Sequence, residues 1–231
     1  MTTRPPVKAP ITRQIVGVIA SRADLLRAVR IKNPPGLFEL RLDHLLHQLD
    51  FVENKLSTLP APFIVTARHP RECGANNLSV NQRRQLLSRF LRRARYVDVE
   101  LRSARALESV LSFARKQTVG RIISFHDFNS TPTVVSLRAK ARAAKSLGAD
   151  IFKVATRTDS KTDLARLLEF FTGHDVDLPI SAMGIGKLGR ESRRELLRLG
   201  SVLNYANLGR VQVRGQPSLS EITRWTLAER R

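Results

Sequence analysis

Eight short apolar runs recur along the chain, and stretches with helical spacing of apolar residues separate them. The runs have the length and the β-branched content of buried strands. They are IVGVIA from Ile15, LFELRL from Leu37, FIVTA from Phe63, YVDVE from Tyr96, RIISF from Arg121, DIFKVA from Asp150, LPISAM from Leu178 and SVLNYA from Ser201. Strict alternation of strands and helices requires right-handed crossovers and a parallel sheet. Eight such units in 231 residues predict an α/β fold, a (β/α)8 TIM barrel.

Local signals place the ends of several helices. Thr131 followed by Pro132 predicts a helix N-cap with proline at the first helical position. Ser160 with Asp163 has the spacing of a capping box, and Gly173 closes the same helix. The chain has no internal linker rich in proline and glycine. We therefore predict one catalytic domain over residues 15–231, preceded by a basic tail with prolines over residues 1–14.

Composition narrows the class of protein. Hydrophobic residues make up 42% and charged residues 26%, which is enough to build a sizeable core. The single cysteine, Cys73, excludes an internal disulfide and suits a reducing compartment. The first residues carry no apolar stretch typical of a secretory signal, and no run is long enough for a membrane span. These features predict a cytoplasmic protein that does not bind membranes.

The formal net charge of +20 favours anionic partners. The densest basic stretch, QRRQLLSRFLRRARY, predicts an amphipathic helix whose apolar stripe packs inward and whose arginines are solvated. The sequence has no zinc-ligand spacing, no RNA-binding aromatic pair and no glycine-rich phosphate loop. A nucleic-acid partner is therefore disfavoured, and no metal site is predicted.

Lys153 lies in the middle of the buried run GADIFKVAT. A buried, unpaired ammonium is costly, so desolvation and repulsion from nearby cations favour the neutral amine, which can attack a carbonyl. The resulting iminium is an electron sink that acidifies the adjacent C–H bond. His126, which ends another run, is the natural proton carrier. These two residues predict a Schiff-base lyase or aldolase.

Further polar side chains follow the predicted strands at their carboxyl ends, where barrels place their active sites. Glu39 and Arg41 are two residues apart and therefore share one face of a strand. The others are Arg68, Glu72, His126, Arg193 and Gln216. Together they predict a rim that binds a small, anionic, hydroxylated molecule and performs acid–base chemistry on it.

Taken in order, these stretches resemble type I 3-dehydroquinate dehydratase, a shikimate-pathway enzyme. FELRLDHL is similar to the family's E-x-R-x-D strand, and PFIVTARHPRECG to its T-x-R-x-x-x-E-G-G block. IISFHDF resembles the histidine strand, and GADIFKVA the Schiff-base lysine strand. AMGIGKLGRESR and GSVLNYANLGRVQVRGQ resemble the M-G…S-R and G-S…G-Q blocks. The resemblance spans residues 15–225 and implies a TIM barrel that converts 3-dehydroquinate into 3-dehydroshikimate.

The resemblance also implies a role for each residue. Lys153 forms the Schiff base, His126 moves the protons and Glu72 orients His126. Glu39, Arg41 and Arg68 match residues that bind ring hydroxyls, and Arg193 and Gln216 match a carboxylate clamp. No cofactor is implied, because the lysine is the electron sink. The expected assembly is a homodimer.

The chain departs from the family pattern in its lid. It has QVRGQ where the family usually has SAPGQ, so Gln212 replaces a serine that touches substrate and Arg214 replaces a proline. Gln212 has a longer side chain than serine and is expected to donate a hydrogen bond in its place. Arg214 either joins the carboxylate clamp or faces solvent. Two other functions stay open: a class I aldolase on the same barrel, and a basic, catalytically idle nucleic-acid-binding protein.

Overall fold

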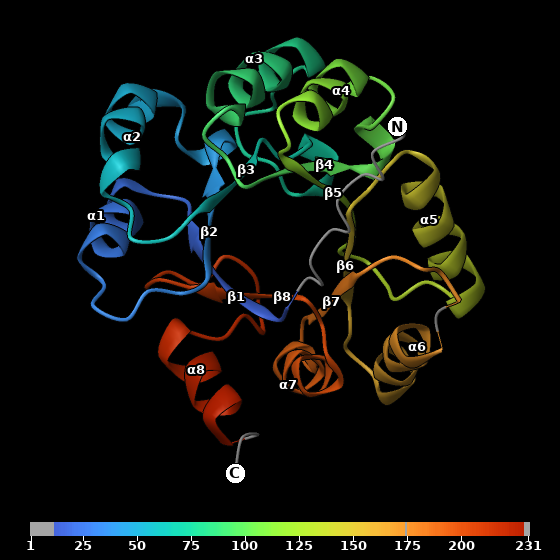
Figure 1. Cartoon of the computed structure of the whole chain (residues 1–231). Helices are drawn as coiled ribbons and strands as arrows, with labels where there is room; N and C mark the ends of the chain where they lie inside the picture. The colour runs from blue at the N-terminus through green and yellow to red at the C-terminus, as the bar shows by residue number, and fades with distance from the viewer. Residues whose placement is uncertain (1–11, 174, 229–231) are drawn as a thin grey trace, which may run out of the picture.

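The computed structural model describes residues 12–173 and 175–228, and within them eight parallel strands form a barrel surrounded by helices (Figure 1). The strands lie in the order β7-β6-β5-β4-β3-β2-β1-β8. They are β1 (Gln14–Ile19), β2 (Leu37–Arg41), β3 (Phe63–Thr66), β4 (Tyr96–Glu100), β5 (Gly120–Asp127), β6 (Ile151–Arg157), β7 (Ile180–Ile185) and β8 (Leu203–Asn207). Each predicted run overlaps one of these strands. The predicted (β/α)8 barrel is confirmed.

The helices follow the strands in turn. They are α1 (Arg22–Arg30), α2 (Leu49–Lys55), α3 (Val80–Leu91), α4 (Glu108–Lys116), α5 (Val134–Ser146), α6 (Lys161–Thr172), α7 (Gly189–Leu199) and α8 (Leu219–Ala228). Two short 3₁₀ turns matter for the site, η4 (Pro70–Glu72) and η5 (Leu101–Ser103). Of the predicted tail, residues 1–11 lie outside the described residues, and β1 begins at Gln14.

The barrel closes where β7 meets β8. The backbone N–H of Val202 donates to the carbonyl oxygen of Ile180 at 3.1 Å. The hydroxyl of Ser181 donates to the carbonyl oxygen of Leu203 at 2.7 Å. A side-chain hydroxyl therefore supplies part of the hydrogen bonding that a regular strand pair would make through its backbone.

The predicted caps are confirmed at α6, and the predicted N-cap is wrong at α5. Ser160 and Asp163 form both halves of the capping box of α6, and Gly173 is its C-cap. The N-cap of α5 is Thr133, whose side chain accepts the N–H of Ser136, and not Thr131 as predicted. The hydroxyl of Thr131 instead donates to the carbonyl oxygen of Arg157 at 2.6 Å. Thr131 therefore ties the loop before α5 to the end of β6.

Side chains that face the barrel interior change from apolar to polar along five of the strands, β2 to β6. The lower level is apolar and includes Leu37, Ile64, Tyr96, Ile122, Ile151 and Leu203. Two residues further along each of five of these strands, the level above is polar and buried, with Glu39, Thr66, Asp98, Ser124 and Lys153. The period of two of a strand brings these five residues to one height. The amino-terminal half of the barrel is a packed core, and the carboxyl half carries the chemistry.

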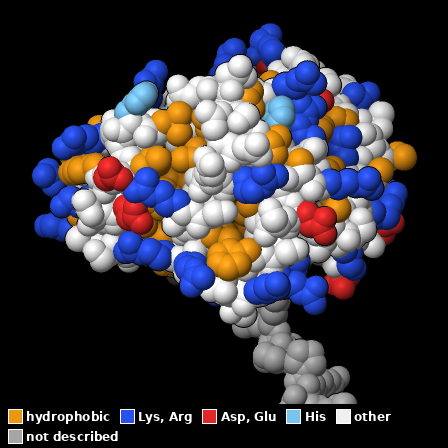
Figure 2. Space-filling model, turned by 90° about the horizontal axis from the view of Figure 1, so that it is seen from above, with side chains coloured by type: hydrophobic (Ala, Val, Ile, Leu, Met, Phe, Trp, Pro, Cys, Tyr) orange, Lys and Arg blue, Asp and Glu red, His pale blue; other side chains and the backbone are white. Residues whose placement is uncertain are grey.

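The arginine-rich helix α3 differs from the prediction at one residue. Arg83 is fully buried, whereas Arg89, Arg92, Arg93 and Arg95 are exposed. Arg83 donates to the carbonyl oxygen of Ala67 at 2.7 Å and to the hydroxyl of Ser103 at 2.9 Å, and it pairs with Glu100. The prediction that this helix has only solvated arginines is wrong, because a carboxylate inside the barrel needs a cation. On the face seen in Figure 2, basic side chains are spread among a smaller number of acidic ones.

We expect Arg83→Leu to lower the free energy of unfolding by about 3–5 kcal/mol, because it leaves the buried Glu100 carboxylate with one cation fewer. Arg92→Leu at the end of the same helix removes the same charge from the surface and should change it by less than about 0.5 kcal/mol. Urea unfolding followed by circular dichroism measures both. Equal effects of the two substitutions would contradict the structural role given to Arg83.

Candidate active site

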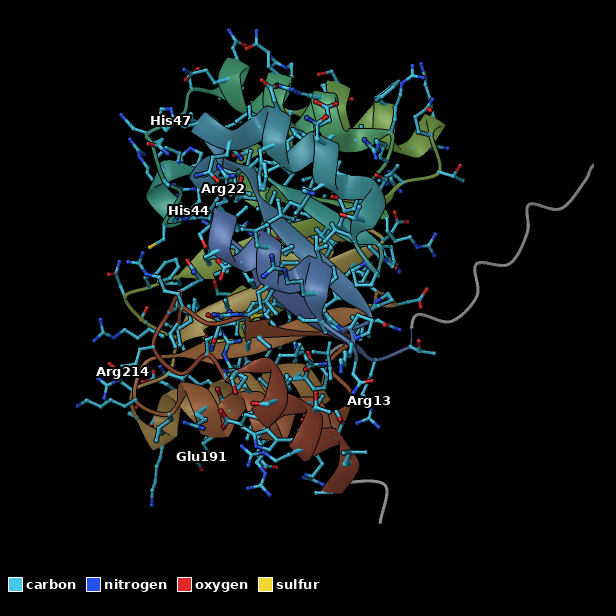
Figure 3. All side chains as sticks on the ribbon, turned by 90° about the vertical axis from the view of Figure 1, so that its left-hand side faces the viewer. Arg13, Arg22, His44, His47, Glu191 and Arg214 are labelled. Carbon is cyan, nitrogen blue, oxygen red and sulfur yellow. The ribbon has the colours of Figure 1, made fainter. Side chains whose placement is uncertain are left out.

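A cavity of about 160 Å³ opens at the carboxyl ends of the strands. A cavity of this size can hold several water molecules or a small ligand. All nine predicted site residues line it: Glu39, Arg41, Arg68, Glu72, His126, Lys153, Arg193, Gln212 and Gln216. Figure 3 shows His44, another lining residue, at the opposite end of the barrel from Arg13. The structure therefore brings together residues from strands β2, β5 and β6, from the segment after β3 that includes η4, from helix α7 and from the loop after β8.

Lys153 projects from β6 into the base of this cavity. Its side chain is only 4% exposed. Its Nζ atom lies 2.8 Å from Asp98 Oδ2 and 3.4 Å from Glu39 Oε1. The same atom lies 4.1 Å from the centre of the Tyr205 ring. A cation between two carboxylates and an aromatic face is fixed in position, with its amine end at the cavity.

Arg68 and Asp98 form a buried ion pair at the base of the site. Arg68 Nη2 donates to Asp98 Oδ2 at 2.9 Å and Nη1 donates to Asp98 Oδ1 at 3.2 Å. Burial raises the pKa of Asp98, but Arg68 and Lys153 outweigh it and hold that pKa well below its usual range. Burial also lowers the pKa of Arg68, and the carboxylates of Asp98 and Glu100 raise it well above its usual value. Both residues are therefore charged throughout the physiological range.

The surroundings of Lys153 differ from those expected from the sequence. We expected nearby cations, but its nearest charged partners are the carboxylates of Asp98 and Glu39. Asp98 and Glu100 were not predicted as site residues. They are two apart in the run YVDVE and share one strand face, as Glu39 and Arg41 do. That alternation was the signal available in the sequence.

Glu72 holds His126 by two hydrogen bonds. Glu72 Oε2 lies 2.9 Å from His126 Nδ1 and accepts the backbone N–H of His126 at 3.1 Å. Its other oxygen, Oε1, lies 3.3 Å from Nε of Arg102, an arginine in η5 that was not predicted to belong to the site. Phe128 stacks on the imidazole, with ring centroids 6.3 Å apart. The ring is fixed in orientation, with its Nδ1 edge on the carboxylate.

The burial of this pair changes both pKa values. Burial, with the positive charges of Arg68 and Lys153, lowers the pKa of His126 well below its usual value. Burial, together with the charge of Glu100, raises the pKa of Glu72 to about 7. His126 is therefore a neutral imidazole at neutral pH, which is the form that can accept a proton.

Arg41 is held at the rim by a buried carboxylate. Its Nε and Nη2 atoms donate to the two oxygens of Asp43 at 3.0 and 2.8 Å, and Nη2 also donates to the carbonyl oxygen of Cys73 at 3.2 Å. Asp43 further accepts the N–H of Ala75 at 3.0 Å. Cys73 has a φ of 60°, the left-handed region that favours glycine. This backbone conformation explains why the T-x-R-x-x-x-E-G-G block that this segment resembles has a glycine at the position of Cys73.

Arg41, Arg68 and Lys153 each contact a carboxylate, whereas Arg193 has no carboxylate partner among the described residues. It lies one turn into α7, where Nε donates to the carbonyl oxygen of Gly184 at 3.0 Å and Nη1 to that of Tyr205 at 3.2 Å. Burial lowers its pKa to about 10. A buried guanidinium bonded only to neutral carbonyls is ready to bind an anion.

The loop after β8 closes the side of the cavity next to Arg193. The side-chain oxygen of Gln216 accepts the backbone N–H of Gln212 at 2.9 Å, so the two predicted binding residues are bonded to each other. The backbone oxygen of Arg214 accepts the N–H of Gly186 at 3.0 Å. The side chain of Arg214 does not line the cavity and is exposed (Figure 3). Of the two placements open for Arg214, the structure has the one facing solvent.

Comparison with known proteins agrees with this geometry. Residues 18–227 match the family model described as type I 3-dehydroquinase. The 3-dehydroquinate dehydratase of Methanothermobacter thermautotrophicus is 32% identical over 95% of this chain and 90% of its own. That of Thermococcus gammatolerans is 33% identical over 90% of this chain and 95% of its own. A crystal structure of type I 3-dehydroquinate dehydratase from Clostridium difficile with covalently modified comenic acid has a TM-score of 0.85, with 25% identity over 95% of this chain and 93% of that one.

Residues 12–173 and 175–228 hold no candidate metal site and no candidate membrane-spanning helix. Histidine, cysteine and carboxylate side chains there form no group of three or more that could hold a metal ion. None of the helices described is long and apolar enough to cross a membrane.

We expect Asp98 to contribute to acid sensitivity. Its pKa is low in the folded protein and ordinary, near 3.9, in the unfolded chain, so its stabilisation is present above about pH 4 and is lost as pH falls below it. Between about pH 4 and 2.5 the free energy of unfolding of the wild type should fall as pH falls. In Asp98→Asn this fall should be less steep than in the wild type, by up to about 1.4 kcal/mol per pH unit. Urea unfolding at several pH values measures this slope. The exposed Asp175→Asn is the control, and identical slopes in all three proteins would contradict the assignment.

Proposed function

The chain belongs to the type I 3-dehydroquinase family, and from this premise we propose that it removes water from 3-dehydroquinate to give 3-dehydroshikimate through a Schiff base on Lys153. The observation that carries the proposal is the shared cavity. Buried Lys153 and His126 come from neighbouring parallel strands, β6 and β5, and open onto one space with Arg193. A nucleophile, a proton carrier and an anion site are the groups that this elimination requires.

Lys153 forms the covalent link. The neutral amine attacks the ring ketone, and loss of water from the adduct gives an iminium. The ammonium must first release a proton, and Asp98 and Glu39 lie within 2.8 and 3.4 Å of Nζ. The iminium withdraws electrons from the adjacent carbon, so its C–H bond becomes acidic. Because the lysine serves as the electron sink, we propose that the reaction needs no metal and no dissociable cofactor.

His126 moves the protons. It takes the proton from C2, the electron pair of that bond forms an enamine, and the enamine then expels the C1 hydroxyl. The imidazolium donates the same proton to the departing oxygen, which leaves as water. Hydrolysis of the iminium releases the product and restores Lys153. The neutral imidazole held by Glu72 at 2.9 Å supports the first of these steps.

The remaining cavity residues position the substrate. We propose that Arg193 binds its carboxylate together with Gln216, and that Gln212 supplies the hydrogen bond of the family's serine. Glu39 and Arg41 are proposed to bind ring hydroxyls. Arg68 is assigned the same role by the resemblance, but its guanidinium already donates to Asp98, Glu100 and Ser124. We propose that Arg68 contributes to binding mainly by holding these groups in place.

Three wider properties follow as proposals from the same assignment. We propose a role in the shikimate pathway and aromatic amino-acid biosynthesis, a cytoplasmic location and a homodimeric assembly. The basic surface is not proposed to bind nucleic acid, because the sequence has no nucleic-acid-binding motif, and on the face seen in Figure 2 basic side chains are interspersed with acidic and apolar ones.

Borohydride trapping tests the proposed function. Treating the protein with 3-dehydroquinate and sodium borohydride should reduce the iminium and add the mass of one reduced ligand to the peptide that contains Lys153. Lys153→Ala should show no adduct, and Lys145→Ala, which removes an exposed lysine, should label normally. A turnover assay with 3-dehydroquinate separates the dehydratase from a class I aldolase. An adduct on another lysine, or none with the wild type, would overturn the proposal.

Arg193 and Arg214 should differ in their effect on substrate binding. Arg193→Ala removes a charge-assisted hydrogen bond and should raise KM for 3-dehydroquinate about tenfold or more. Arg214→Ala removes the same charge from an exposed side chain outside the cavity and should change KM by less than about twofold. Steady-state kinetics at low and moderate salt measure both, and a large effect of Arg214→Ala at both salt concentrations would place that arginine in the clamp after all.

A further inference from the structure

We propose that Arg102 is a positioning residue for His126, the proton carrier. Arg102 pairs with Oε1 of Glu72, and Oε2 of the same carboxylate then keeps His126 in the tautomer that can act as a base. This inference rests on the proposed function, because it assigns a role within the same reaction. Arg102 lies in η5, directly after β4, and is not among the residues that the sequence indicated.

The two oxygens of Glu72 have separate partners. Oε2 accepts the backbone N–H of His126 at 3.1 Å and lies 2.9 Å from its Nδ1. Oε1 forms the ion pair with Nε of Arg102 at 3.3 Å. While Glu72 is ionised, it can only accept hydrogen bonds, and the positive charge of Arg102 beside Oε1 favours that ionised form. The imidazole must then carry its proton on Nδ1, which leaves the lone pair on Nε2 to accept the proton of the substrate.

The charges around Glu72 make this arrangement easy to lose. Burial and the neighbouring carboxylate of Glu100, from β4, raise the pKa of Glu72 to about 7. Arg68, after β3, and Arg102 oppose that rise. Arg68 is already bonded to Asp98 and Glu100. Arg102 is therefore the cation that directly contacts the Glu72 carboxylate among the described residues.

The other groups that face Glu72 do not replace this cation. His126, from β5, is neutral at neutral pH because burial lowers its pKa. Cys73, the next residue in the chain, has its thiol pKa raised by burial and by the charge of Glu72. Neither group adds positive charge at Oε1.

Protonation of Glu72 would disable the base. A neutral carboxyl group can donate its proton to Nδ1 of His126, and the imidazole then carries its own proton on Nε2, facing away from the carboxylate. That tautomer cannot accept a proton from the substrate. Removing Arg102 raises the pKa of Glu72, so a larger fraction of the enzyme is in the disabled form at neutral pH. The acid limb of the pH profile of kcat/KM should therefore move to higher pH.

The position of Arg102 allows a clean experiment. Its side chain is 45% exposed, so its removal leaves no buried hole. Arg105, three residues later, is also exposed and is a matched control for loss of one positive charge. Arg102→Lys keeps the charge and serves as the conservative rescue.

We would compare the pH profiles of kcat/KM for the wild type, Arg102→Leu, Arg102→Lys and Arg105→Leu. Arg102→Leu should move the acid limb upward by about 0.2–0.7 pH units, the range expected for a partly exposed ion pair. Arg102→Lys should restore at least half of that shift, and Arg105→Leu should leave the limb in place. An unmoved limb in Arg102→Leu, or equal movement in Arg105→Leu, would overturn the inference.

A second measurement separates this inference from the proposed function. Nitrogen-15 NMR of histidine-labelled protein reports the tautomer of His126 without any turnover, with its signals assigned by their loss in His126→Asn. At about pH 8, above the pKa of Glu72, the wild type should show mainly the Nδ1–H tautomer, and Arg102→Leu should show a larger share of Nε2–H. Unchanged tautomer populations would refute the role of Arg102 even if the dehydratase assay succeeds. A changed population would support it even if the wild type fails to turn over 3-dehydroquinate.

Discussion

Asp98 pairs with two of the cations that lie inside the barrel, Arg68 and Lys153, through contacts of 2.9 and 2.8 Å. Each of these charges costs several kcal/mol to remove from water, and only a carboxylate of good geometry at the same depth offsets that cost. Arg68 also contacts Glu100, and Glu100 is in turn paired with Arg83 of α3. One line of ion pairs therefore connects an outer helix to the lysine at the base of the cavity. The position of Lys153, the proposed nucleophile, depends on that line.

The two sides of the cavity are built differently, and the difference has a chemical consequence. On the side of β2 to β6, buried cations and carboxylates contact one another, so a ligand meets groups that are already oriented. On the side of α7 and β8, Arg193 is bonded only to the carbonyl oxygens of Gly184 and Tyr205. An entering carboxylate supplies the negative charge that this side lacks. A ligand that carries both a carbonyl and a carboxylate would therefore bind in one orientation, with its carboxylate toward Arg193 and its carbonyl toward Lys153.

The lid beside Arg193 depends on close contact between glycine backbones. Gly215 has a φ of 90°, and a Cβ atom added to it would lie 2.8 Å from the Cα atom of Gly189. A residue with a side chain would push the loop away from the start of α7, the helix that carries Arg193. The chain replaces the family's serine and proline in this loop, yet it retains the glycine and Gln216. The part of the lid that packs is kept, and the part that faces solvent or ligand varies.

The sequence by itself determined the barrel and the ring of candidate residues, because strand alternation and the carboxyl-end position of polar residues are local patterns. It also singled out Lys153 as an anomaly, since a lysine in an apolar run is visible without coordinates. Only the tertiary structure decided which charges pair. The partners of Lys153, Arg83 and Glu72 lie 55, 17 and 30 residues away from them in the chain, and no spacing rule links positions on different strands. An ion pair depends on distances of a few ångströms, which the folded barrel alone establishes.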